Sequence, residues 1–192
     1  MTENEVTQKG SEVGGDQVGR DKYTNAPQYN FASSKKGTSP MSHLLKKFEE
    51  ERKNDSKLDS FIEELDYFNR PIKGDVIGLE QKLIDGKREA FIDFALRAKE
   101  SFHKKLFKFQ FSESAQKINI HLLALVESYF MHHICPKIHN GHSSEEISSL
   151  IQELLVNPLL NELEENTLGF TATDINGMLY FLTGNCHIKW IK

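Results

Sequence analysis

Residues 117–130 (KINIHLLALVESYF) constrain the fold more than any other stretch of this chain. Helical spacing spreads its apolar residues over nearly every side of one helix: Ile118, Ile120, Leu122, Leu123, Leu125, Val126, Tyr129 and Phe130. A helix that is apolar almost all round has to be covered by other elements, so we expect it at the centre of a domain. The apolar run continues to Ile134, but its His and Glu residues make it too short and too polar to span a bilayer.

Other parts of the chain carry the three-and-four-residue apolar spacing of amphipathic helices. These segments are residues 41–53, 55–68, 78–109, 143–155 and 173–184. No segment alternates apolar and polar residues over any length, as a half-buried strand would. The sequence therefore predicts an all-α fold, a single bundle of about five or six helices.

Caps and helix breakers set the expected boundaries. The candidate N-terminal caps are Ser42, Ser112 or Ser114, Ser143 or Ser144 (with Glu146 forming a capping box with Ser143) and Thr173. The expected breaks are Gly86, which splits the long helix, Pro136, which limits the central one, Asn157–Pro158, and Gly184, which ends the last helix. Residues CHIKW (186–190) then leave the last helix as an extended tail.

Residues 1–40 differ in composition from the rest of the chain. They are rich in Gly, Ser, Thr and Asn and contain almost no aliphatic side chains, so they bury too little apolar area to offset the entropy of ordering. We expect a flexible tail or a turn-rich docking segment at 1–40, followed by a helical interaction domain at 41–192.

Bulk composition favours a soluble protein of the cytoplasm. The net charge is −4 with 27% charged residues, which gives no general attraction to nucleic acid. The N-terminus has no apolar secretory segment, and two cysteines, Cys135 and Cys186, suit free thiols in a reducing compartment.

The segment VGGDQVGRDKY (13–23) has the glycine spacing of a phosphate-binding loop but not its chemistry. Arg20 and Asp21 stand where that loop needs Lys and Ser or Thr, and Asp16 would repel phosphate inside the cradle. The polar residues before it cannot form the buried strand that such a loop follows. We therefore interpret it as a docking or linker segment.

A histidine-rich stretch raises the possibility of a zinc site. It contains His132, His133, Cys135, His139 and His142, with Cys186 and His187 available elsewhere. No CxxC or HExxH element sets a ligand geometry, and Pro136 scatters the side chains. The favoured interpretation is that His133 or Cys135 packs in the core while the other histidines are solvated loop residues. We therefore assign no metal and no cofactor, and the question of a metal stays open.

The long helix suggests two functional alternatives. Arg97 and His103 have a spacing that resembles the R-x4–6-H motif of HEPN ribonucleases, which are also small helical bundles. One face of this helix is basic and is expected to be solvated or to meet an acidic partner: Lys87, Arg88, Arg97, Lys99, Lys104, Lys105 and Lys108. The second alternative is nucleic-acid binding through Lys99, Lys104, Lys105 and Lys108.

Two stretches resemble sequences of bacterial conflict systems. GGDQVGRDKY (14–23) resembles the G-D-x-V-x-G-D-K segment found near the N-terminus or at module junctions of many such proteins. INGMLYFLTGNCHIKW (175–190) resembles the end of the small helical C-terminal domain of ABC-three component systems, which are predicted antiphage systems related in organisation to Lamassu-type defence. The resemblance implies that an SMC/Rad50-like ABC ATPase acts with a middle component and an effector that carries this domain.

The resemblance further implies a non-catalytic interaction subunit of such a complex, docking to the ATPase or the middle component. In this family a toxic domain usually precedes the helical module, whereas only the 1–40 segment precedes it here. The expected partner-binding residues are Gly15, Asp16, Arg20, Asp21, Lys22, His187 and Trp190. Trp190 has an alternative role, covering the core of its own domain. We expect no membrane association and nucleic acid only through the complex, and we leave the oligomeric state open.

Overall fold

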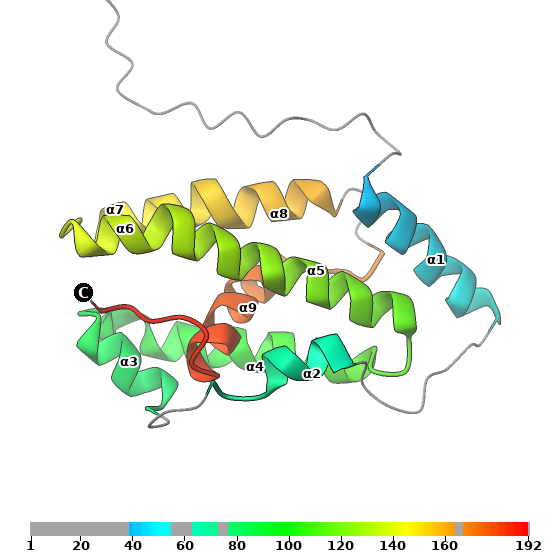
Figure 1. Ribbon diagram of the computed structural model, residues 1–192, viewed down its shortest axis with the longest axis horizontal. Coiled ribbons are helices and arrows are strands. Elements are labelled where there is room, and N and C mark those ends of the chain that lie inside the picture. The colour runs from blue at the N-terminus through cyan, green and yellow to red at the C-terminus, as the bar shows by residue number, and fades with distance from the viewer. Residues whose placement is uncertain (1–38, 55–62, 73–76, 164–166, 192) are drawn as a thin grey trace, which may run out of the picture. The chain divides into compact units, whose positions relative to one another are not determined.

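The structure is a computed structural model that describes residues 39–54, 63–72, 77–163 and 167–191. Over these ranges the chain forms helices and connecting loops and no strands, which confirms the all-α prediction (Figure 1). The helices are α1 Pro40–Asn54, α2 Glu63–Asn69, α3 Leu79–Asp85, η1 Glu89–Phe91, α4 Ile92–Lys108, α5 Glu113–Tyr129, η2 Phe130–Ile134, α6 Cys135–His139, α7 Ser144–Ile151, η3 Gln152–Val156, α8 Asn157–Glu162 and α9 Ala172–Gly184. None of these described helices combines the length and the apolarity needed to cross a bilayer.

Two prolines that we expected to interrupt helices lie within continuous ones. Pro136 and Pro158 each occupy the first turn of the segment that follows a five-residue π-helical stretch. The wider π turn changes the hydrogen-bond register, and proline is tolerated in a first turn because its missing N–H has no helical acceptor there. The chain thus runs without a break from α5 to α6 and from α7 to α8, so the described residues hold seven continuous helices.

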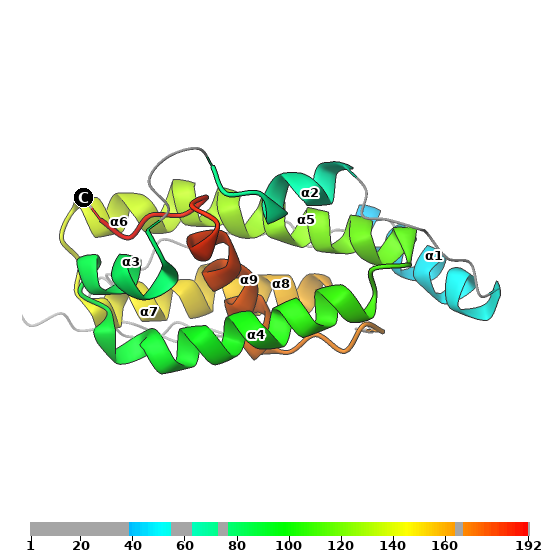
Figure 2. The ribbon, with the colours of Figure 1, turned by 90° about the horizontal axis from the view of Figure 1, so that it is seen from below.

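The core forms where α9 meets the rest of the bundle. Helix α9 packs chiefly on α4 and also contacts α3, α5 and α8, and Figure 2 shows it passing between α5 and α4. Gly177 allows the close approach of α4, because a Cβ atom there would lie 2.3 Å from the carbonyl oxygen of Ala98. Helix α5 contacts α1, α2 and α9.

Helix α5 is central, as its apolar pattern predicts. Ile118, Leu122, Leu123 and Val126 are completely buried. Its N-terminal turns also bury polar side chains, and Gln116 donates to the Gln110 carbonyl oxygen at 2.6 Å.

The structure confirms some predicted boundaries. Ser112 caps α5 by accepting from the Ala115 N–H at 3.1 Å, and Ser143 forms the predicted capping box with Glu146. The long helix does split at Gly86, which ends α3.

Two predicted caps are wrong. At α1 the capping residue is Ser39 and not Ser42. The Ser39 hydroxyl accepts a hydrogen bond from the backbone N–H of Ser42 at 3.1 Å. At α9 the cap is Thr171, because Asp174 three residues later completes a capping box with it, whereas Thr173 lies inside the helix. Both helices carry a second serine or threonine two or three residues before the predicted cap, and in each case that earlier residue caps the helix.

Candidate interaction site

The C-terminal segment leaves α9 in an extended conformation and folds back into the core. Trp190 is 2% exposed, and its ring lies 5.0 Å from the ring of Phe130 at 71° and 6.4 Å from that of Tyr180 at 23°. The indole Nε1 donates to the Thr183 hydroxyl at 3.1 Å. Gly86 completes this pocket, since a Cβ atom there would lie 2.6 Å from Trp190 Cβ. The structure therefore supports the alternative role of Trp190, covering its own core.

Arg88 is buried beside Trp190, which corrects its placement on a solvated basic face. Its side chain lies between two rings, with the guanidinium carbon 4.4 Å from the Phe91 centroid and 4.8 Å from that of Trp190. It donates to the Ser148 hydroxyl at 2.8 Å and to the Ser144 carbonyl oxygen at 3.4 Å. Burial lowers the pKa of this guanidinium. Helical spacing does not predict the burial of Arg88, because the chain is not helical here: Lys87 has a left-handed backbone (φ 56°) and turns the chain between α3 and α4.

A cleft of about 580 Å³ opens next to Arg88 and Trp190. The loop after α3 and the C-terminal segment form one side, and α6, α7 and their connection form the other. Its lining residues are Asp85, Gly86, Lys87, Arg88, Ile138, Gly141, His142, Ser143, Ser144, Ile147, Trp190 and Ile191. Such a volume accommodates a few side chains of a bound molecule.

His187 anchors the same C-terminal segment to α5 and α2. Its side chain is fully buried, with Nδ1 3.3 Å from Glu127 Oε1, and its ring contacts those of Tyr67 and Phe68 at 5.1 and 5.7 Å. The Glu127 distance is that of an ion pair, but neither ring nitrogen has hydrogen-bond geometry to a described residue. The two side chains are therefore close enough for an electrostatic interaction but do not form a hydrogen bond.

Cationic side chains gather at the C-terminal end of α9, where carbonyl groups carry partial negative charge. Buried Lys82 donates to the Thr183 carbonyl oxygen and, at 3.0 Å, to Cys186 Sγ. Cys186 has a left-handed backbone (φ 66°) at this turn. The Lys99 amine lies near Gly184, and its pKa is lowered by burial and, to a smaller extent, by Lys82.

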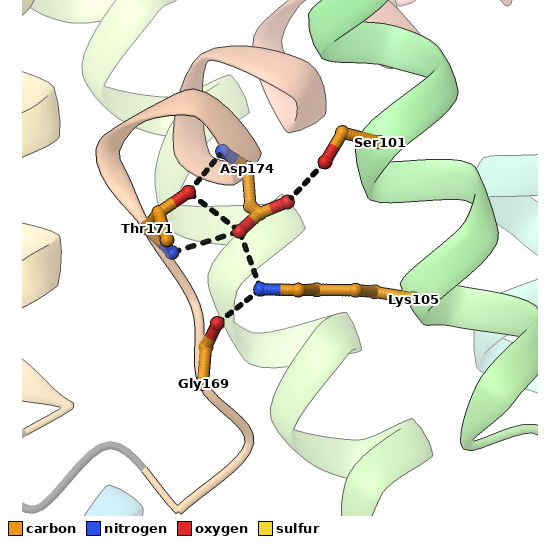
Figure 3. A network of polar contacts seen from close by, with 5 residues as sticks. All are labelled: Ser101, Lys105, Gly169, Thr171 and Asp174. Carbon is orange, nitrogen blue, oxygen red and sulfur yellow. Dashed lines mark hydrogen bonds and ion pairs between the residues drawn. The ribbon is translucent and has the colours of Figure 1, made fainter.

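The N-terminal end of α9 is held by a buried carboxylate (Figure 3). Asp174 accepts from Lys105 at 2.5 Å and from Ser101 at 2.8 Å on α4, and from the Thr171 N–H and hydroxyl at 2.8 Å. Lys105 also donates to the Gly169 carbonyl oxygen. Burial raises the pKa of Asp174, but these hydrogen bonds together outweigh it, so the net pKa lies below the ordinary carboxyl value.

The basic side chains proposed for nucleic-acid binding are partly occupied within the domain. Lys105 belongs to the Asp174 network, Lys104 pairs with Glu100 at 2.6 Å, and Lys99 is half-buried. Lys108 is exposed, with its amine 5.2 Å from the Phe109 ring centroid. This face therefore presents fewer free cations than the sequence suggests.

Arg97 and His103 are both exposed on α4 and do not converge. Six residues along a helix correspond to about 9 Å of rise and about 120° of rotation. The His103 ring contacts that of Phe107 in a tilted arrangement, with the ring centroids 4.7 Å apart and the planes at 57°. The geometry does not favour the ribonuclease alternative.

The histidine-rich stretch spans η2, α6 and the loop before α7. His139 Nδ1 lies 2.8 Å from the Cys135 carbonyl oxygen and 3.4 Å from its Sγ, and His142 Nδ1 lies 3.1 Å from the Lys137 carbonyl oxygen. Within the described ranges, no three His, Cys, Asp or Glu side chains are grouped as metal ligands.

The predicted partner-binding residues fall into two sets. Five lie outside the described residues: Gly15, Asp16, Arg20, Asp21 and Lys22. The other two, His187 and Trp190, lie on the C-terminal segment and are buried, and of the two only Trp190 lines the cleft. Partner binding through all seven remains a prediction.

Comparison with known proteins identifies the domain. Residues 78–190, more than half of the chain, match CTD9, described as C-terminal domain 9 of the ABC-three component (ABC-3C) systems. The match begins just before α3 and ends at Trp190, and the GDxVxGDK-like segment lies outside it. Neither the curated proteins nor the solved structures contain a significant match. The chain belongs to the CTD9 family of C-terminal domains of ABC-three component systems.

Proposed function

We propose that this protein is a non-catalytic interaction subunit of a bacterial antiphage complex, which docks to an SMC/Rad50-like ABC ATPase or to its middle component. The observation that carries the proposal is the CTD9 match, because the family is defined within systems of three components. A chain with such a domain works with other chains, and catalysis resides in one of them. The proposed place of action is the cytoplasm.

The proposal assigns docking to two regions. The segment with Gly15, Asp16, Arg20, Asp21 and Lys22 offers close backbone approach and paired charges, which suit specific recognition. The helical domain supplies the second surface, at the end where the C-terminal segment lies. Deleting residues 186–192 is a poor test of this end, because it removes buried Ile188 and Trp190 from the core.

Affinity purification of the tagged full chain from its native host, followed by mass spectrometry, tests the docking role. We expect an ABC ATPase at fixed stoichiometry. Replacing the four charged residues of the first region by alanine (Asp16, Arg20, Asp21 and Lys22) should weaken its retention. A matched control replaces Lys35 and Lys36, which lie in the same 1–40 segment outside that region.

Two results would contradict the proposal. One is recovery of the chain without either an ABC ATPase or a middle component. The other is RNA degradation by the purified chain that stops in the His103→Ala variant, which would favour the enzyme.

A further inference from the structure

Arg88 is a buried cation without a carboxylate partner among the described residues. The residue is 4% exposed, and no described Asp or Glu oxygen lies within ion-pair distance of it. A guanidinium has five N–H donors. The described acceptors are one hydroxyl and one distant carbonyl, and Nε is buried with no acceptor.

The positive charge of Arg88 is therefore not neutralised by a described carboxylate, and some of its N–H donors have no described acceptor. A buried charge is costly unless it is paired and hydrogen-bonded, and the two aromatic rings on either side of Arg88 supply only part of the compensation. Contact with the same two rings restricts the movement of the guanidinium. A restricted guanidinium with open donors is suited to binding a carboxylate through two parallel hydrogen bonds.

Arg88 is one of the residues that line the neighbouring cleft. Exposed Lys87 lines it as well, and Asp85 is the one carboxylate among the described lining residues. Ile138, Ile147, Trp190 and Ile191 provide apolar walls. The cleft thus combines a buried cation with apolar surface.

We infer that this cleft binds a carboxylate side chain of a partner protein, an Asp or Glu flanked by apolar residues, which pairs with Arg88 while its neighbours contact the isoleucines. The partner is one of the other components, so the inference in this respect rests on the proposed function.

The lining favours an acidic peptide over nucleic acid. A polyanion needs several accessible cations, but Asp85 lies in the cleft and Glu145 and Glu146 stand on the first turn of α7 beside it. One buried cation among apolar side chains suits a single negative charge next to aliphatic groups.

NMR titration of the full chain tests the inference directly. The probe is the peptide acetyl-Leu-Glu-Leu-amide, its neutral control is acetyl-Leu-Gln-Leu-amide, and a third titration uses inorganic phosphate. We expect the Glu peptide to shift the Arg88 Nε–H and Trp190 indole signals. The Gln peptide should bind at least about tenfold more weakly, because it lacks the charge-assisted hydrogen bonds.

Substitutions at Ile191 test the location without touching the buried arginine. Ile191 is 47% exposed, so Ile191→Asp and Ile191→Asn should both fold. The Asp variant repels an acidic ligand, and we expect it to weaken Glu-peptide binding several-fold more than the Asn variant of similar size. Equal effects of the two variants would overturn the charge argument.

The remaining outcomes are also decisive. Phosphate binding without peptide binding, equal binding of the two peptides, or no shift at Arg88 with either peptide would overturn the inference. If the chain retains the ATPase but binds neither peptide, the proposed function stands and the inference about the cleft is wrong. If the chain binds the Glu peptide but retains neither an ABC ATPase nor a middle component, the cleft binds a carboxylate and the proposed function is wrong.

Discussion

Gly86 and Trp190 are 104 positions apart in the sequence, yet the space that a Cβ atom on Gly86 would occupy is 2.6 Å from Trp190 Cβ. The same imaginary atom would lie 3.1 Å from the Trp190 carbonyl oxygen. The turn after α3 and the C-terminal segment therefore fit together only because residue 86 lacks a side chain. This contact joins the first and last parts of the CTD9 domain.

Gly86→Ala should lower the free energy of unfolding by about 1–3 kcal/mol, the usual cost of overpacking. Gly86 has φ −81°, which alanine adopts readily, so the steric contact with Trp190 is the cause. Urea denaturation followed by the fluorescence of the single tryptophan measures the change. Gly78→Ala is the control, because nothing lies within 4 Å of its Cβ position, and we expect it to stay within about 0.5 kcal/mol of the parent.

Gly177→Ala should be more damaging, with a loss of about 3 kcal/mol or more. The added methyl group meets the Ala98 carbonyl oxygen at 2.3 Å and Phe102 Cβ at 2.7 Å, so α4 and α9 have to separate. Thermal unfolding by circular dichroism is the measurement, with Asn176→Ala as a neighbouring control. In an uncrowded helix the Gly→Ala exchange would stabilise by about 1 kcal/mol, and a rise in stability would contradict this packing.

Trp190 fluorescence distinguishes two modes of partner binding. With the C-terminal segment in place, emission should be blue-shifted and acrylamide should quench it poorly, because the indole is 2% exposed. If the partner occupies the cleft beside Arg88, the indole stays shielded from acrylamide in the complex. If His187 and Trp190 themselves bind the partner, the segment has to leave its position first. Transient exposure would then appear as increased hydrogen exchange at Ile188.

Asp174→Asn should destabilise the fold at neutral pH by about 2–4 kcal/mol, since it breaks a buried pair with Lys105 and one half of the α9 capping box. The folded-state pKa of Asp174 lies below its unfolded value. The carboxylate therefore contributes fully above the unfolded value of about 3.9, and its contribution is lost as pH falls from there through the folded-state pKa.

The difference in stability between the parent and Asp174→Asn should accordingly shrink below about pH 4. Urea unfolding at a series of pH values measures it. Glu100→Gln is the matched control, since it removes the exposed pair with Lys104 and is expected to leave the midpoint unchanged. A constant difference down to low pH would show that Asp174 acts through shape and not through charge.

Local sequence rules predicted the elements of this fold but not how they meet. Apolar spacing located α5 and α4, and Gly86 and Ser112 marked true boundaries. The same rules failed at Pro136, because a π-helical stretch shifts the hydrogen-bond register before the proline and the sequence carries no local sign of that shift.

The candidate site depends on contacts between distant residues, which helical spacing cannot show. Helical spacing predicts Arg88 as one member of a solvated basic face. It is buried because the chain turns at Lys87 and because Trp190 packs against it. The sequence suggests partner-binding roles for Trp190 and His187. It does not predict that both side chains are buried, because helical spacing does not show that the last segment turns back past α9. The glycine at 86 was identified as a helix breaker, and its role as a packing surface had no signal in the sequence.

The return of the C-terminal segment also sets an order of events during synthesis. Trp190 fills a space between η2, α9 and the α3 loop, so the helices made earlier cannot close their shared interior while that residue is still inside the ribosome. Until then, apolar surface on Phe130 and Tyr180 has no final cover. Closure of this domain therefore waits until residue 190 has left the ribosome, and the earlier helices expose apolar surface until that point.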